Sequence, residues 1–118
     1  MTTASSTLDS ILQHRIVAIL RGCDPEHIGA IAGALYAGGI RLLEITLNSP
    51  DAFPAIERLS ASMGDRLVIG AGTVLDAAGA VSAIAAGARF ILSPSLDIPT
   101  IRRTLDLGAV SIPGAFTA

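Results

Sequence analysis

The 118-residue sequence contains no lysine, and all eight of its cationic side chains are arginines. Ten acidic residues bring the formal net charge to −2, which gives no electrostatic attraction to nucleic acid or to an anionic membrane surface. The absence of lysine also means that these residues supply no lysine amine for nucleophilic catalysis. We therefore expect neither nucleic acid nor a membrane as a partner.

Cysteine is nearly absent as well. Cys23 is the single cysteine, so an internal disulfide is excluded and a reducing, cytoplasmic location is expected. The two histidines, His14 and His27, lie far apart in the sequence, so we predict no metal site and no other cofactor. Residues 1–6 lack the basic segment of a signal peptide, and no apolar run approaches the roughly 18 residues of a membrane span.

Apolar sequence is plentiful: 51% of the residues are hydrophobic and only 15% are charged. That balance is typical of an α/β protein whose strands are covered on both faces. Apolar spacing predicts a leading helix over residues 7–14, and Asp24 and Asp76 are predicted to begin later helices as N-caps. Short apolar runs between turn residues predict strands near 16–20, 42–47, 67–71, 90–93 and 110–112.

The predicted strands alternate with helical segments, and their starting points are 20 to 26 residues apart. Strict alternation indicates parallel strands joined by right-handed crossovers, either in an open doubly wound sheet or in part of a (β/α)8 TIM barrel. Eight such units would need roughly 180 to 200 residues, so residues 1–118 are expected to form a single partial barrel domain. We favour the barrel because Arg21-Gly22 follows the first strand in place of a dinucleotide fingerprint.

One carboxylate stands inside an apolar strand. Glu44 lies among leucine and isoleucine residues in the strand over 42–47, and a buried charge is costly unless it is paired or has a chemical task. Strand alternation places Glu44, Thr46 and Asn48 on one face of the sheet. In parallel α/β proteins the carboxyl ends of the strands carry the active site, so this face is the candidate.

Side chains from successive strand ends should converge on that rim. They are Arg21, Glu44, Asn48, Thr73, Ser93-Pro94 and Pro113-Gly114. A partly desolvated Glu44 could move protons at neutral pH, and Arg21 could bind a carboxylate or phosphate. Arg21 could equally be the charge partner of Glu44. Asn48 and Thr73 offer neutral hydrogen bonds for orienting hydroxyl or carboxylate oxygens.

Five motifs in this order resemble the KDPG/KHG aldolase family from about residue 8 onward. They are Ala18-Ile-Leu-Arg-Gly22, Leu43-Glu-Ile-Thr-Leu-Asn-Ser-Pro50, Ile69-Gly-Ala-Gly-Thr-Val-Leu75, Ile91-Leu-Ser-Pro94 and Ile112-Pro-Gly114. The resemblance implies a class I (Schiff-base) aldolase that cleaves 2-keto-3-deoxy-6-phospho sugar acids to pyruvate and glyceraldehyde 3-phosphate. Asn48 is closer to the phosphogalactonate branch, because the phosphogluconate branch usually carries an arginine there.

By this resemblance Glu44 is the proton donor and acceptor, Arg21, Asn48 and Thr73 bind substrate, and Pro94 lines the pyruvate pocket. The family's imine-forming lysine lies on a sixth strand, and such barrels bind phosphate after strands seven and eight. These 118 residues include neither feature, so we expect the isolated chain to lack aldol cleavage. The family is commonly trimeric, which implies self-association.

Two alternatives stay open beside an aldolase portion. One is a non-catalytic half barrel that assembles with a complementary piece, since the first and fifth strands would be unpaired edges. The other is an open-sheet phosphate- or nucleotide-binding domain that uses Gly70–Thr73, where two of three fingerprint glycines occur. The sequence is interpreted most simply as part of a longer protein, and secondly as a truncated product.

Overall fold

The structure, a computed structural model, describes residues 3–117 and contains one parallel sheet with the strand order β1-β2-β3-β4-β5. The strands are β1 (Ala18–Leu20), β2 (Leu42–Thr46), β3 (Val68–Gly72), β4 (Phe90–Ser93) and β5 (Val110–Pro113). The helices are α1 (Ala4–His14), α2 (Ile28–Ala37), α3 (Ala52–Met63), α4 (Ala77–Ala86) and α5 (Ile98–Asp106). The predicted fold class, parallel (β/α) units of an incomplete TIM barrel, is confirmed. Every neighbouring pair is parallel, and the strands follow the chain order, whereas a doubly wound sheet reverses its strand order at a switch point.

The helix starts show how local chemistry sets the boundaries. The α1 helix begins at Ala4, three residues before the predicted start, because Thr3 and Ser6 form a reciprocal capping box. Asp76 caps α4 as predicted, accepting a 2.8 Å hydrogen bond from the Gly79 amide. The prediction for Asp24 is wrong, since its carboxylate accepts from the Glu26 amide in a turn and α2 begins only at Ile28.

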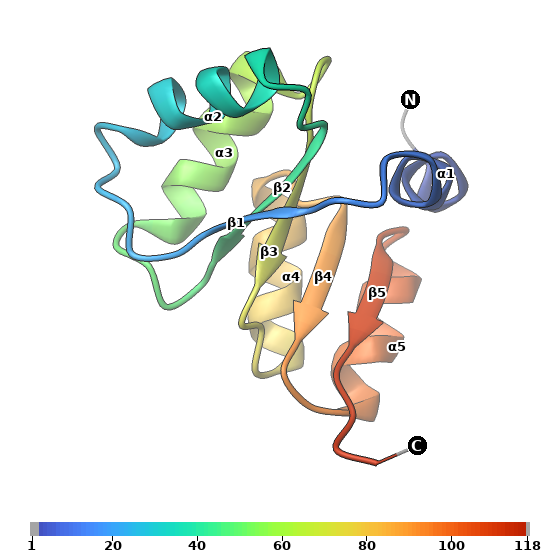
Figure 1. Ribbon diagram of the computed structural model, residues 1–118. Coiled ribbons are helices and arrows are strands. Elements are labelled where there is room, and N and C mark those ends of the chain that lie inside the picture. Colours follow the sequence, from blue (N-terminus) through green and yellow to red (C-terminus); the bar gives the residue numbers. More distant parts are fainter. Residues whose placement is uncertain (1–2, 118) are drawn as a thin grey trace.

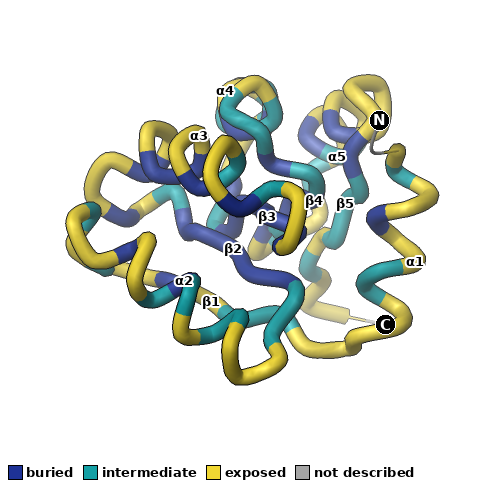
Figure 2. Tube along the Cα trace, turned by 90° about the horizontal axis from the view of Figure 1, so that it is seen from above, coloured by how far each residue is buried: buried dark blue, intermediate teal, exposed yellow. Residues whose placement is uncertain are grey.

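Helices α2–α5 cover one face of the sheet, whereas α1 lies across the end at which the strands begin (Figure 1). The main core fills the space between the sheet and these helices, and it includes Leu43 and Ile45 of β2 with Ile56 and Leu59 of α3. The central strands are almost entirely buried, and the outer sides of the helices are exposed (Figure 2). Each helix is therefore held by an apolar stripe.

The opposite face of the sheet carries a smaller cluster, in which Leu42, Val68 and Phe90 are buried against partly buried neighbours from α1 and β5. The Phe90 ring occupies the space above Gly70, where a Cβ atom would collide with it. Gly70 therefore serves side-chain packing inside β3 rather than a phosphate-binding loop. Gly70, one of the two glycines on which the nucleotide-binding alternative depends, therefore has a packing role.

Within the described residues β1 and β5 are the two edges of the sheet. Ile19 of β1 is 58% exposed, although it lies in a strand of an apolar sheet. No helix of residues 3–117 is long and apolar enough to cross a membrane. That residues 1–118 form a single partial barrel domain stays a prediction.

Candidate functional site

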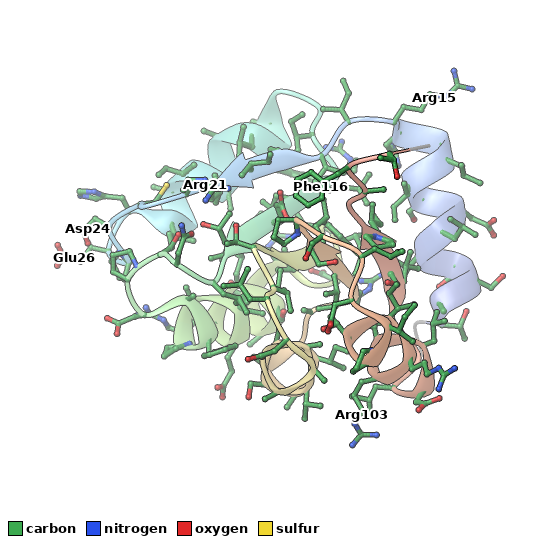
Figure 3. The ribbon with its side chains drawn as sticks, turned by 90° about the horizontal axis from the view of Figure 1, so that it is seen from below. Arg15, Arg21, Asp24, Glu26, Arg103 and Phe116 are labelled. Atoms are coloured by element: carbon green, nitrogen blue, oxygen red, sulfur yellow. The ribbon has the colours of Figure 1, made fainter. Side chains whose placement is uncertain are left out.

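The predicted rim exists as a cavity at the carboxyl ends of the strands, the side seen in Figure 3. A hollow of about 200 Å³ is lined by Arg21, Glu44, Thr73, Leu92, Ser93 and Pro94. Asn48 lies in an adjoining hollow of about 290 Å³, which shares Thr73 as a wall. Five strand-end positions from the sequence are thus brought to one place, because parallel strands end on the same side of the sheet.

Glu44 is the acidic group of this cavity, and its residue is only 3% exposed. Burial raises the pKa of the Glu44 carboxyl, and the positive charge of Arg21 offsets part of that rise. The Oε2 atom is buried and has no hydrogen-bond partner among the described residues. The raised pKa favours the protonated form of this unpartnered carboxyl, which can donate a proton in that form and accept one when ionised.

Gly72 gives that carboxyl its room. A Cβ atom at residue 72 would collide with Oε2 and Cδ of Glu44, so any larger residue would displace the side chain. Glu44 pairs with Gly70 across the β2–β3 ladder, and Gly72 is two residues further along the same strand. The two glycines of β3 face the same side of the sheet, where Gly72 leaves space for the Glu44 carboxyl and Gly70 leaves space for the Phe90 ring.

The Arg21 side chain is exposed, and its hydrogen bond goes to Asn48, just after β2, and not to Glu44. Its Nη1 atom donates a 3.3 Å hydrogen bond to Oδ1 of Asn48. Arg21 and Glu44 form no ion pair: the one found among the described residues joins Arg66 to Asp65. Arg21 affects the pKa of Glu44 only through its charge, without direct contact. One donor is committed to Asn48, and the guanidinium keeps other N–H groups for a ligand.

Ser49 is a site-supporting residue that the sequence analysis did not single out. Its hydroxyl accepts a 2.8 Å hydrogen bond from the Gly22 amide and lies 2.8 Å from the Thr46 hydroxyl. This buried contact ties the turn after β1 to the turn after β2, and so fixes Arg21 relative to Asn48. The sequence did contain an indication of this role, because a serine in a turn such as Asn-Ser-Pro commonly hydrogen-bonds to backbone groups nearby.

Thr73 and Pro94 are held by contacts between successive loops. Thr73 has a left-handed backbone with φ of 54°, and the next amide, of Val74, donates to the Leu92 carbonyl at 3.1 Å. The Gly114 amide donates to the Ser93 carbonyl at 2.8 Å, and a Cβ atom at residue 114 would collide with the Pro94 carbonyl. The Pro-Gly motif of the fifth strand thus supports the cavity wall.

The rim has the chemical groups needed to bind an anion and to move a proton. Among residues 3–117 no group of three or more histidine, cysteine, aspartate or glutamate residues is placed to hold a metal ion. The chemistry available is a buried proton donor and acceptor, an exposed guanidinium and neutral hydrogen-bond donors around one small hollow.

Comparison with known proteins points in the same direction. A family model for KDPG and KHG aldolases matches residues 8–118. The probable 2-dehydro-3-deoxy-6-phosphogalactonate aldolase of Rhizobium meliloti (strain 1021) is 39% identical over 106 residues, which are 90% of this chain and 50% of that protein. The 2-dehydro-3-deoxy-6-phosphogalactonate aldolase of Escherichia coli (strain K12) is 36% identical over 87% of this chain and 50% of that protein.

A solved structure resembles the chain equally well. The KDPG aldolase of Legionella pneumophila, solved with pyruvate captured as a covalent carbinolamine intermediate, is 35% identical and superposes with a TM-score of 0.80. The superposition covers 86% of this chain and 48% of that one. The chain spans about half the length of the curated relatives it matches.

Proposed function

Because the chain belongs to the KDPG and KHG aldolase family, we propose that it forms the amino-terminal part of a class I aldolase. The proposed reaction is the cleavage of 2-keto-3-deoxy-6-phosphogalactonate or -phosphogluconate to pyruvate and glyceraldehyde 3-phosphate. The names of the relatives support this substrate class, and Asn48 favours the galactonate. A cytoplasmic location and self-association are parts of the same proposal.

Glu44 is the residue that carries the proposal. Imine formation and carbon–carbon cleavage both need a group that gives and takes protons beside the keto carbon. Glu44 lines the cavity, its carboxyl is buried and its pKa is raised, and its Oε2 atom has no hydrogen-bond partner among the described residues. Buried without a hydrogen-bond partner, that oxygen is costly unless a reacting ligand supplies one.

The other rim residues hold the substrate in this proposal. Arg21 binds the carboxylate end through its fork of N–H groups, and Asn48 keeps the guanidinium in place. Thr73 hydrogen-bonds a hydroxyl or carboxylate oxygen between the two adjoining hollows. Pro94 closes the apolar side, where the methyl group of pyruvate would lie.

The covalent step needs an amine that these residues do not contain. A class I aldolase condenses a lysine amine with the keto group, and the imine then accepts the electron pair of the breaking bond. The 118 residues include no lysine. We therefore propose that Glu44 shuttles protons only when a segment carrying the amine completes the barrel.

A chimera tests this function directly. Residues 1–118 would replace the matching amino-terminal half of the Escherichia coli phosphogalactonate aldolase, and pyruvate release would be followed with lactate dehydrogenase. We expect cleavage by the chimera and a loss of about 10²-fold or more in kcat with Glu44→Gln. Glu57→Gln, on the exposed side of α3, is the matched control and should retain activity.

Failure has a clear form in this experiment. A folded chimera that binds pyruvate but cleaves no phosphorylated keto sugar acid would remove the proposed substrate class. Equal activity of the Glu44→Gln and parent chimeras would remove the role of Glu44, whatever the substrate.

A half barrel that assembles without catalysis is the second candidate, and the two sheet edges favour it. Ile16, just before β1, and Ile19, within it, are 60% and 58% exposed, which leaves apolar surface beside the unpaired edge of β1. This candidate predicts a defined dimer with one cooperative melt. A polydisperse sample by light scattering, without near-ultraviolet circular dichroism, would exclude it.

A further inference from the structure

A second polar cavity lies at the opposite end of the sheet from Glu44, where the strands begin. It has a volume of about 200 Å³. Its lining includes the three arginines Arg41, Arg66 and Arg89, together with Asp65 and His14. Arg41, Arg66 and Arg89 each come directly before an apolar strand segment, so the parallel topology gathers them exactly as it gathers the opposite rim. We call this hollow the arginine cavity.

The charge of the arginine cavity is uncompensated. Three arginines and one aspartate line it, which leaves a net charge of +2 with histidine neutral. Arg41 and Arg66 share one aromatic ring, with their guanidinium carbons 4.1 Å and 5.8 Å from the centroid of Tyr36. Asp65 lies 3.4 Å from Arg66 but is itself 81% exposed, so water weakens that ion pair.

Arg89 is the most desolvated of the three. Its Nε atom is buried with no hydrogen-bond partner among the described residues, and burial lowers the pKa of its guanidinium. The group stays charged at neutral pH, because an arginine is not deprotonated in proteins. No carboxylate pairs with Arg89 among the described residues, so this partly buried positive charge has no counterion there.

Capping of helix ends explains only part of this arrangement. Arg41 donates twice from Nη1, to the carbonyls of Tyr36 and Ile40. Arg89 donates to the Gly64 carbonyl at 3.3 Å, and Arg66 donates to the Ser62 carbonyl at 3.0 Å. Each guanidinium carries five N–H donors, so most donors of the cluster remain available. The carbonyl contacts hold the three side chains in place.

We propose that the arginine cavity binds a small phosphate-type dianion, either inorganic phosphate or the phosphate of a monoester. Guanidinium forks match the oxygen pairs of phosphate, and a charge of +2 matches a dianion. A liquid water occupies about 30 Å³, so the hollow has room for one tetrahedral oxyanion and a few waters. This site is separate from the aldolase rim and does not depend on the proposed reaction.

The site is tested by measuring the melting temperature at increasing anion concentration, because a ligand that binds only the folded chain raises the melting temperature. Inorganic phosphate and glycerol phosphate would be compared with chloride at matched ionic strength. We expect both phosphates to raise the melting temperature beyond the chloride control. The more effective of the two identifies the natural source as free phosphate or a phosphate ester.

Single arginine variants locate the binding. Arg66→Gln changes a side chain that is 47% exposed, so the fold should survive, and phosphate affinity should fall about tenfold with the loss of a charged hydrogen bond. Arg41→Gln provides a second variant with the same expected loss. Arg103→Gln on α5 is the matched control, because Arg103 points away from the molecule (Figure 3) and should leave affinity unchanged.

Three results would overturn the proposal. Phosphate could give no shift beyond that of chloride. The Arg66 and Arg41 variants could lower the melting temperature equally with and without phosphate, which is the behaviour of helix caps alone. Arg21→Gln could abolish the phosphate shift, which would place the anion at the aldolase rim instead.

Discussion

Gly72 provides the space into which the Glu44 carboxyl extends, since a Cβ atom at residue 72 would collide with Oε2. The two residues belong to neighbouring strands, β3 and β2, and both are buried. The proposed proton-transfer group of the rim, Glu44, thus occupies space that the absence of a side chain at Gly72 leaves free. The contact between Gly72 and Glu44 can therefore be tested by measuring stability, without an assay of catalysis.

Gly72→Ala should destabilise the chain by about 1–3 kcal/mol, because the added methyl group must displace the carboxyl or the strand. Urea denaturation would measure the free energy of unfolding. Gly29→Ala is the matched control: it is exposed on α2 with open space around it, and alanine should stabilise that helix slightly. In the double variant with Glu44→Ala, most of the Gly72→Ala cost should disappear. Equal costs with and without Glu44 would contradict the steric explanation.

Glu44→Gln should change how stability depends on pH. The pKa of Glu44 is raised in the folded chain, so the folded state binds more protons than the unfolded state between the two pKa values. Stability should therefore fall as the pH rises from about 4.3 through the raised pKa, where the buried carboxyl ionises. The glutamine variant should lose this component and be the more stable form at high pH.

Thermal melts of parent and variant from pH 4 to pH 9 would measure the difference, with Glu57→Gln as an exposed control. Parallel curves for all three proteins would show that Glu44 titrates alike in both states.

Ser49→Ala should cost about 1–3 kcal/mol, because it leaves the Gly22 amide without its hydroxyl acceptor and removes the contact with Thr46. Amide hydrogen exchange at Gly22 should also become faster. Ser82→Ala, on the exposed side of α4, is the control and should be neutral or slightly stabilising. Unchanged exchange at Gly22 in Ser49→Ala would mean that the turn is held by other contacts.

Borohydride should leave the mass of the isolated chain unchanged after incubation with pyruvate, because no lysine amine is present to form an imine. Mass spectrometry would detect the reduced adduct as an added mass. The chimera with the Escherichia coli relative is the positive control. An adduct on the 118-residue chain would require a different amine and would refute the argument from lysine.

The sequence predicted the β–α alternation from the succession of strand and helix patterns along the chain. It predicted the face on which Glu44 lies from the alternation of side chains along one strand. It could not decide whether Arg21 pairs with Glu44 or with another group, since that depends on side-chain reach between two strands. The structure gives the bond to Asn48. The role of the β3 glycines was also out of reach, because Phe90 and Glu44, which fill their space, come from neighbouring strands.

The arginine cavity was missed although its signal was present. Arg41, Arg66 and Arg89 each precede a strand, and the logic that gathered the carboxyl ends would also have gathered these positions. Their hydrogen bonds to helix-end carbonyls could not be foreseen, because they depend on where α2 and α3 end. The misplaced start of α2 has the same origin, since Asp24 can cap a turn as well as a helix.

The strand order β1-β2-β3-β4-β5 has a consequence for folding during synthesis on the ribosome. Each strand joins an edge made by the strand synthesised just before it, and no strand must wait for a distant partner. The sheet can grow from the ribosome in the direction of translation, one unit at a time, with a short loop-closure cost at each step. Among the five strands, β1 is synthesised first, and its outer edge stays unpaired while β2 to β5 are added.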